Sequence, residues 1–246
     1  MFELILLIFG LVWGSFIGAF KDRLDDPKSL LVGRSICPRC KKRLGFVDLI
    51  PVVGYLVLRG RCRYCRKPIS PYYPLLEILC AALAIIIWRY FTLSASSVFL
   101  FVSLSFLTLA ALTDIEDQEV DAILFFIGIA SAALYLVFSK NFTMFSLWGA
   151  LTYALIPFLL YLLSREKWMG LGDTFFGLWA GLLVGFPLSL PAVFLSFLLG
   201  ALFGIIKLAT GAKSNRIAFG PFLALGAIIT LIWSQWVLEF YLGIFY

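Results

Sequence analysis

Long apolar runs are the feature that most limits the folds open to this chain. A helix that crosses a lipid bilayer needs about 20 consecutive, mostly apolar residues. Such runs recur along most of the 246 residues, and 62% of the chain is hydrophobic, whereas soluble domains are roughly 45–50% apolar. The sequence therefore predicts an all-α polytopic membrane protein of about eight transmembrane helices. We expect these helices near residues 2–20, 74–93, 97–113, 122–139, 143–163, 174–189, 190–210 and 218–243.

One segment differs in composition from the rest of the chain. Residues 21–73 are polar and contain thirteen of the twenty Lys and Arg residues and four of the five cysteines. We interpret them as a small domain inserted between the first two helices. The predicted organisation is a first transmembrane helix at 1–20, a cytoplasmic tetracysteine zinc domain at 21–73 and a seven-helix membrane domain at 74–246. The first helix has no basic n-region and no A-x-A site, so we expect it to be retained.

The distribution of basic residues predicts how the chain is oriented. Cytoplasmic loops of membrane proteins carry an excess of Lys and Arg. If residues 21–73 face the cytoplasm, alternation of the helices places eighteen of the twenty basic residues on that side and leaves only Arg89 and Lys140 outside. The net charge of +6 then reflects membrane orientation, and we expect no nucleic-acid partner. The basic domain is also suited to contact anionic membrane lipids.

Four cysteines of the inserted domain form two Cys-x-x-Cys pairs. Cys37 and Cys40 are followed, after twenty-one residues, by Cys62 and Cys65. Pairs with this separation are typical of a tetrahedral structural zinc site, and a metal would stabilise a domain with too small a core of its own. Two disulfides and four unliganded thiols are the alternatives, and a reducing cytoplasm disfavours the disulfides. Cys80 lies in the second apolar run, where we expect an ordinary core residue.

The absence of histidine limits the chemistry open to the chain. It excludes a Ser-His-Asp triad and a histidine-based zinc protease site. Two acidic sites map to the cytoplasmic face. Asp173 follows Gly170-Leu171-Gly172, and Asp114 ends the third apolar run and begins an acidic cluster. Two carboxylates that share a proton can activate water and polarise a carbonyl group, so an aspartate pair is one way in which this chain could hydrolyse a peptide bond.

Each acidic site also has a structural interpretation. A glycine turn followed by Asp173 is typical of a helix N-cap. The acidic cluster, residues 114–121, is compatible with a solvated loop, and Asp114 and Asp121 would share a helical face only if the helix continued. Two rival functions stay open at this point. One is a membrane transporter with intramembrane cation-binding aspartates, and the other is a scaffold whose zinc domain binds a partner.

Several motifs along the chain are characteristic of one family. They include Gly14-Ser15-Phe16, Asp48-Leu49-Ile50-Pro51, the run from Leu58 to Cys65, Tyr73-Pro74-Leu75-Leu76-Glu77 and the run from Ala218 to Gly226. With these motifs the chain resembles the bacterial type IV prepilin peptidases (prepilin leader peptidase/N-methyltransferase), membrane aspartic proteases of the GxGD class. In this resemblance Asp114 matches the first catalytic aspartate of the family and Asp173 the second.

The resemblance implies a substrate, a second activity and a location. Members cleave a short basic leader from type IV prepilin or pseudopilin precursors at the cytoplasmic face of the bacterial inner membrane. Members with the four-cysteine domain also methylate the new N-terminus with S-adenosylmethionine, which here implies a role for residues 21–80. The candidate substrate- and cofactor-binding residues are Gly170, Gly172, Arg23, Gly60, Arg61 and Glu77. The first two would let an extended substrate backbone approach, and the other four would serve methylation.

Three positions depart from the pattern of this family. Gly18 stands where Asn is frequent, Phe175 stands where a Lys usually follows the second aspartate, and Asp121-Ala122 stands where Pro-Asp is usual. The first departure bears on methylation and the other two on substrate preference. None of them removes an aspartate of the pair.

Overall fold

The computed structural model describes residues 1–24, 35–37, 39–91, 93–210 and 217–245. Within these ranges the chain is almost entirely helical, and the β pairing consists of two isolated bridges, Ile36 with Arg43 and Arg61 with Pro68. Five of the described helices are long and apolar enough to cross a membrane, and three shorter apolar helices accompany them. The predicted all-α membrane protein of about eight transmembrane helices is therefore confirmed.

The helices follow the predicted apolar runs closely. The long ones are α1 (Phe2–Lys21), α4 (Tyr72–Tyr90), α5 (Ala95–Asp117), α7 (Met144–Ser164) and α9 (Ser189–Ala209). The shorter ones are α6 (Ala122–Phe138), α8 (Leu171–Val184) and α10 (Gly220–Ile232). The described residues pack as two compact units, Met1–Arg89 and Tyr90–Tyr246. This grouping reflects packing, and the division into residues 1–20, 21–73 and 74–246 stays a prediction.

Small residues allow the two long helices of the first unit to pack closely. A Cβ atom at Gly10 would lie 2.5 Å from the Cα atom of Ala81, and a Cβ atom at Gly14 would lie 2.7 Å from the Cα atom of Glu77. Only glycine lets α1 and α4 approach this far. Small residues spaced by four are a common means of helix association in lipid, where no hydrophobic force drives the helices together.

A short 3-10 helix and a short α-helix lie between the two cysteine pairs. They are η1 (Phe46–Leu49) and α3 (Val53–Val57). The two are joined by a tight turn, in which the N–H of Gly54 donates to the carbonyl oxygen of Ile50 at 2.8 Å. The N–H of Val52 donates to Oε2 of Glu77 at 2.7 Å. This bond attaches the η1–α3 segment to the beginning of α4.

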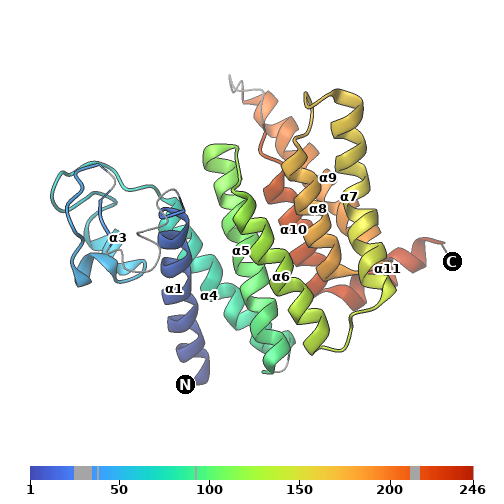
Figure 1. Cartoon of the computed structure of the whole chain (residues 1–246), viewed down its shortest axis with the longest axis horizontal. Coiled ribbons are helices and arrows are strands. Elements are labelled where there is room, and N and C mark those ends of the chain that lie inside the picture. Colours follow the sequence, from blue (N-terminus) through green and yellow to red (C-terminus); the bar gives the residue numbers. More distant parts are fainter. Residues whose placement is uncertain (25–34, 38, 92, 211–216, 246) are drawn as a thin grey trace. The chain divides into compact units, whose positions relative to one another are not determined.

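Two largely buried helices, α5 and α8, form the centre of the second unit. Helix α5 packs against α6 and α10, and α8 packs against α6, α7 and α10. Trp179 of α8 is completely buried, and its indole N–H donates to Oγ of Ser103 in α5 at 2.8 Å. In Figure 1, α6 runs beside both α5 and α8. The two candidate aspartates belong to this buried pair of helices.

The acidic cluster is arranged differently from the sequence expectation. Helix α5 does not end at Asp114 but continues to Asp117, and Gln118 then adopts a left-handed conformation with φ of 57°. Asp121 is the N-cap residue of the following helix, α6. Since the chain reverses at Gln118, Asp114 and Asp121 do not share a helical face. The helix would have had to continue past Gln118 to place both residues on one face.

The prediction of one continuous helix over the eighth apolar run was wrong. The expected helix at 218–243 is divided into α10, which ends at Ile232, and α11 (Ser234–Phe245). Trp233 separates them with a non-helical backbone at φ −104° and ψ 34°. Hydropathy does not detect such a break, because the residues on both sides of it are apolar.

Candidate functional site

The two candidate aspartates lie at the ends of buried helices, and each is held by a backbone donor. Asp114 is in the last turn of α5, and its Oδ2 accepts a hydrogen bond from the N–H of Gly220, the first residue of α10, at 3.0 Å. Asp173 is in the first turn of α8, and its Oδ2 accepts from the N–H of Gly170 at 3.1 Å. Asp173 thus does help to cap α8. This bond engages only one of its carboxylate oxygens.

Both aspartates line the same cavity, which has a volume of about 1260 Å³. The fold thus brings two carboxylates that are far apart in the sequence to one cavity. Gly170 and Gly172 line the cavity as well. A Cβ atom at Gly172 would have no atom of the chain within 4 Å. The space in front of this glycine is therefore open to a ligand.

Sequence reasoning gave no role to Glu119, which lines the cavity, or to Gly220, whose N–H holds Asp114. Glu119 is exposed, as expected for the solvated part of the acidic cluster, and it also lines the cavity. Gly220 was noted only as part of the Ala218–Gly226 motif. A Cβ atom at Gly220 would lie 2.8 Å from Oδ2 of Asp114 and 2.6 Å from Cε2 of Phe176. The motif was the available signal for Gly220, but its contact with Asp114 depends on packing between distant segments.

Two of the departures from the family pattern lie away from the cavity lining. The ring of Phe175 packs against Phe125 of α6, with ring centroids 5.7 Å apart. Asp121 is the N-cap residue of α6, and its side chain makes no capping hydrogen bond. Neither residue belongs to the set that lines the aspartate cavity. Any effect of these two positions on substrate preference would therefore be indirect, through the residues that they contact in the fold.

The four cysteines of the two Cys-x-x-Cys pairs converge on one point. Their sulfur atoms all lie within 4.8 Å of one another, with Cys37 and Cys65 separated by 4.0 Å. No disulfide joins these four described residues. Four sulfurs around one zinc at the usual distance of about 2.3 Å would be separated by roughly 3.8 Å in a tetrahedron. The donor set and its spacing therefore fit zinc, and the cluster could hold such an ion.

The backbone around the two cysteine pairs is nearly identical. In the first pair the N–H of Cys37 donates to the carbonyl oxygen of Lys42 and the N–H of Lys41 donates to that of Cys37, each at 2.9 Å. In the second pair the N–H of Cys62 bonds to Lys67 in the same way, also at 2.9 Å. Each turn thus directs two thiols to the same side, which is what a shared metal requires.

The thiols also influence one another electrostatically. Burial raises the pKa of Cys37, but hydrogen bonds from the backbone of Cys40 and Arg39 and from neighbouring thiols outweigh this effect and lower the pKa to about 7. The pKa of Cys40 is raised to about 11, because burial and the other thiols outweigh the hydrogen bond from the Lys42 backbone. A cluster that accepts one negative charge readily and resists a second would gain from a bound cation.

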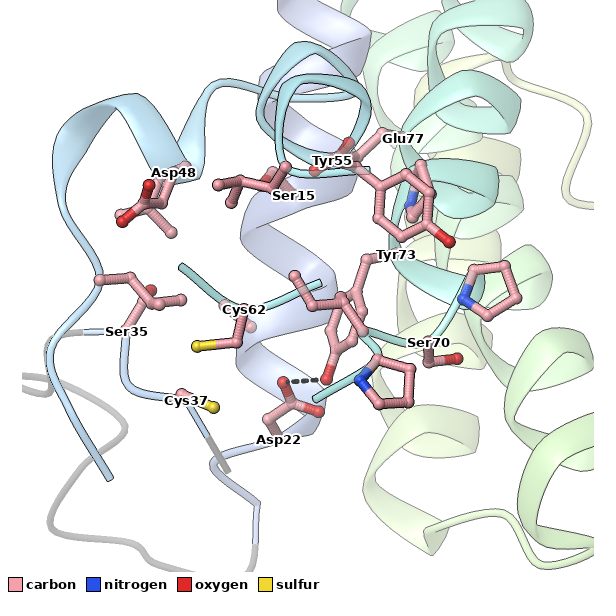
Figure 2. Close-up of a pocket in the computed structure, with 18 of the residues that line it drawn as sticks. Ser15, Asp22, Ser35, Cys37, Asp48, Tyr55, Cys62, Ser70, Tyr73 and Glu77 are labelled. Carbon is pink, nitrogen blue, oxygen red and sulfur yellow. Dashed lines mark hydrogen bonds between the residues drawn. The ribbon is translucent and has the colours of Figure 1, made fainter. Parts of the chain in front are cut away.

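A second cavity, of about 490 Å³, lies in the first unit and is shown in Figure 2. Residues of α1, of the beginning of α4 and of the cysteine-rich segment enclose it. Glu77 is only 7% exposed, and its carboxylate accepts from the N–H of Val52. The hydroxyl of Tyr73 donates to Oδ2 of Asp22 at 2.9 Å. Asp48 also lines this cavity and pairs with Arg63. Glu77 and Asp22 are therefore the carboxylates left to face a ligand, together with the basic side chains of Arg39 and Lys67.

The other candidates for methylation are not brought to the lining of this cavity. Arg23 lies just beyond α1, where its N–H donates to the carbonyl oxygen of Phe20. Gly60 has a positive φ of 67°, and a Cβ atom there would lie 2.9 Å from the hydroxyl oxygen of Tyr55, which does line the cavity. Arg61 pairs with Pro68 in an isolated bridge. Of the four residues, the structure places Glu77 alone in the lining.

Comparison with known proteins agrees with these two units. Residues 8–91 match the model of the bacterial peptidase A24 N-terminal domain, and residues 100–205 match that of the type IV leader peptidase family. A prepilin leader peptidase/N-methyltransferase of Bacillus subtilis (strain 168) is 31% identical, with 97% of each chain covered. One from Legionella pneumophila is 31% identical over 91% of this chain and 81% of the relative. One from Pseudomonas aeruginosa is 29% identical, with 98% and 93% covered. No solved structure matches the chain significantly.

Proposed function

The chain belongs to the type IV leader peptidase family, and from this premise we propose that Asp114 and Asp173 together cleave the leader peptide from type IV prepilin or pseudopilin precursors. The observation that carries the proposal is that both aspartates line one cavity. Membership of a peptidase family leaves the transporter and scaffold interpretations without support.

The proposed mechanism uses the aspartates as one unit. An ionised carboxylate accepts a proton from a water molecule, which attacks the scissile carbonyl carbon, while the protonated partner donates a hydrogen bond to the carbonyl oxygen. When the tetrahedral intermediate collapses, the C–N bond breaks and the leaving amine takes a proton from the pair. Backbone donors at Gly220 and Gly170 hold one oxygen of each carboxylate. The other oxygens are then available for water and substrate.

Methylation of the new N-terminus is the second part of the proposal. The three relatives are named as N-methyltransferases as well as peptidases. We assign this activity to the first unit, with S-adenosylmethionine as methyl donor and with Arg23, Gly60, Arg61 and Glu77 as contributors. The carboxylates of Glu77 and Asp22 in this cavity could face the two cationic groups of this reaction, the sulfonium of the donor and the amine of the product. Transfer breaks the S–CH₃ bond, forms an N–CH₃ bond and releases a proton that a carboxylate can accept.

Zinc and membrane orientation complete the proposal. We infer that one zinc ion, held by Cys37, Cys40, Cys62 and Cys65, stabilises the cysteine-rich segment. The helices described above identify the chain as a membrane protein, and we place it in the bacterial inner membrane. The basic segment, the zinc site and the aspartate cavity would face the cytoplasm, since this orientation satisfies the preference of Lys and Arg for that side.

The test of the peptidase mechanism is the pair of variants Asp114→Asn and Asp173→Asn. Asparagine keeps an acceptor oxygen for the N–H of Gly220 or Gly170, so each variant should insert and fold normally. Neither variant can complete the proton cycle, and each should lose cleavage of a purified prepilin-type precursor. The double variant should be no worse than either single variant, because residues that act as a unit do not contribute additively.

Asp117→Asn is the matched control. Asp117 is exposed and is the last residue of the same helix, α5, so this variant should cleave normally. If Asp114→Asn and Asp173→Asn still cleave the precursor, the aspartate mechanism is wrong. Methylation is measured separately, as the gain in mass of one CH₂ at the N-terminus of a pre-cleaved substrate. The Asp variants should retain this gain, and its loss would contradict the assignment of methylation to the first unit.

A further inference from the structure

The segment between the two cysteine pairs exposes an unusual amount of apolar surface. Residues 46–57 contain a single charged residue, Asp48. Its side chain is only 3% exposed and forms an ion pair with Arg63, with Oδ1 and Nε 2.7 Å apart. The outward side chains are all apolar, and they include Phe46 at 86% exposure and Leu56 and Val57 at 65% each. Val47, Leu49, Ile50 and Val53 of the same segment are exposed as well.

Contacts within the first unit fix the depth of this segment relative to its two long helices. Val52 donates its N–H to Glu77, and Gly14, the residue before Ser15 in α1, packs against the Cα atom of Glu77. Ser15 precedes Lys21, the first charged residue at that end of α1, by six residues, or about 9 Å at 1.5 Å per residue. Glu77 lies five residues after Tyr72, the first residue of α4, or about 7.5 Å. The segment therefore packs beside the apolar parts of α1 and α4, nearer the middle of each helix than its polar end.

The flanks of the segment have the opposite character. Lys41, Lys42 and Arg43 precede it and are exposed, and Arg59, Arg61 and Arg63 follow it and are exposed. An apolar face bordered by Lys and Arg is the pattern of protein segments that lie in a membrane interface. Basic side chains there attract anionic headgroups. Monomeric soluble proteins rarely expose a continuous apolar patch of this kind without a partner.

We propose that residues 46–57 form an interfacial membrane anchor. The side chains of Phe46, Leu56 and Val57 insert into the boundary between headgroups and acyl chains of the same bilayer that α1 and α4 cross. The flanking Lys and Arg residues contact anionic headgroups. The occupant of this surface is lipid because the segment lies level with the apolar parts of two spanning helices and is continuous in character with their lipid-facing side chains, such as Phe16. The anchor would hold the cavity around Glu77 and the cysteine cluster against the membrane surface.

The experiment is photo-crosslinking from defined positions. The full chain carries p-benzoylphenylalanine in place of Phe46, Leu56 or, as a matched control, Tyr64. Tyr64 is an exposed aromatic residue in the second cysteine turn, where Lys42 lies 5.3 Å from its ring centroid. Each protein is reconstituted in vesicles of phosphatidylglycerol and phosphatidylethanolamine and irradiated, and adducts are identified by mass spectrometry. All three positions are exposed, so the substitutions should not disturb folding.

Lipid adducts should form at positions 46 and 56 in several-fold higher yield than at position 64. Two results would overturn the proposal. One is an equal or absent lipid yield at the three positions. The other is that positions 46 and 56 crosslink to protein, either to residues 90–246 of the same chain or to a second copy, which would identify this surface as a protein interface.

Discussion

The substitution Gly220→Ala tests how the aspartate cavity is built. Gly220 is the first residue of α10, and its N–H donates to Oδ2 of Asp114 at 3.0 Å. A methyl group at this position would lie 2.8 Å from that same oxygen and 2.6 Å from Cε2 of Phe176. Carbon atoms normally approach to about 3.5–4.0 Å. Either α10 or the Asp114 side chain must therefore move, and the hydrogen bond between them must lengthen or break.

The expected magnitude follows from the two effects of the methyl group. Overpacking of a tight site costs about 1–3 kcal/mol of stability. A hydrogen bond to a charged group contributes about 1.5–3 kcal/mol. If Asp114 must hold its position in the transition state, losing the hydrogen bond would lower kcat by roughly 10- to 150-fold. The KM for the precursor should change little, because the methyl group affects the carboxylate and leaves the open space before Gly172 unaltered.

The assay is cleavage of a purified prepilin-type precursor, together with a thermal denaturation curve. The matched control is Gly226→Ala in the same helix, where a methyl group would lie 2.7 Å from the carbonyl oxygen of Ala192 and would crowd Ser196. This control should lower stability at least as much as Gly220→Ala without a comparable loss of kcat. If Gly220→Ala cleaves at the wild-type rate, or if the two variants lose kcat equally, Gly220 does not position Asp114 and the reasoning fails.

Three further predictions concern the two cavities and the cysteine cluster. Gly172→Ala should leave thermal stability unchanged, since the methyl group meets no atom of the chain within 4 Å, but should lower kcat/KM; an unchanged kcat/KM would argue against a substrate backbone at this position. Metal analysis should find about one zinc per chain, as expected for a Cys₄ site, and a strong decrease in Cys37→Ser; equal zinc in both proteins would refute the site. Glu77→Gln keeps an acceptor for the N–H of Val52 but removes the charge. It should abolish methylation and spare cleavage, and parallel loss of both activities would show a structural effect instead.

The sequence determined the class of fold because the relevant information is local. Each apolar run that spans a membrane is contained within about 20 consecutive residues, so its length and composition can be read directly. The two Cys-x-x-Cys pairs are local in the same sense, since each pair forms one turn. Their convergence within 4.8 Å followed the expectation from their separation. Asp114 and Asp173 were found as candidates from motifs of a few residues each.

Tertiary structure decided how these local pieces are placed relative to one another. The donor to Asp114 comes from Gly220, and the donor to Glu77 comes from Val52. Neither hydrogen bond can be predicted from the local hydrophobic periodicity, because each joins residues that are far apart in the sequence. The cavity position of Glu119 was missed because an acidic residue after a helix looks the same whether it faces solvent or a site. The break at Trp233 was missed because hydropathy averages over a window and does not report backbone dihedral angles.

The exposure of the apolar residues in 46–57 is another property that the sequence does not predict. Its residues are hydrophobic in the sequence, and hydrophobic residues in a small domain are usually assigned to its core. Only the fold shows that Asp48 turns inward to Arg63 while Phe46 and Leu56 point outward. Side-chain burial is a property of the packed molecule, because it depends on which distant segments cover a residue, and local sequence does not contain that information.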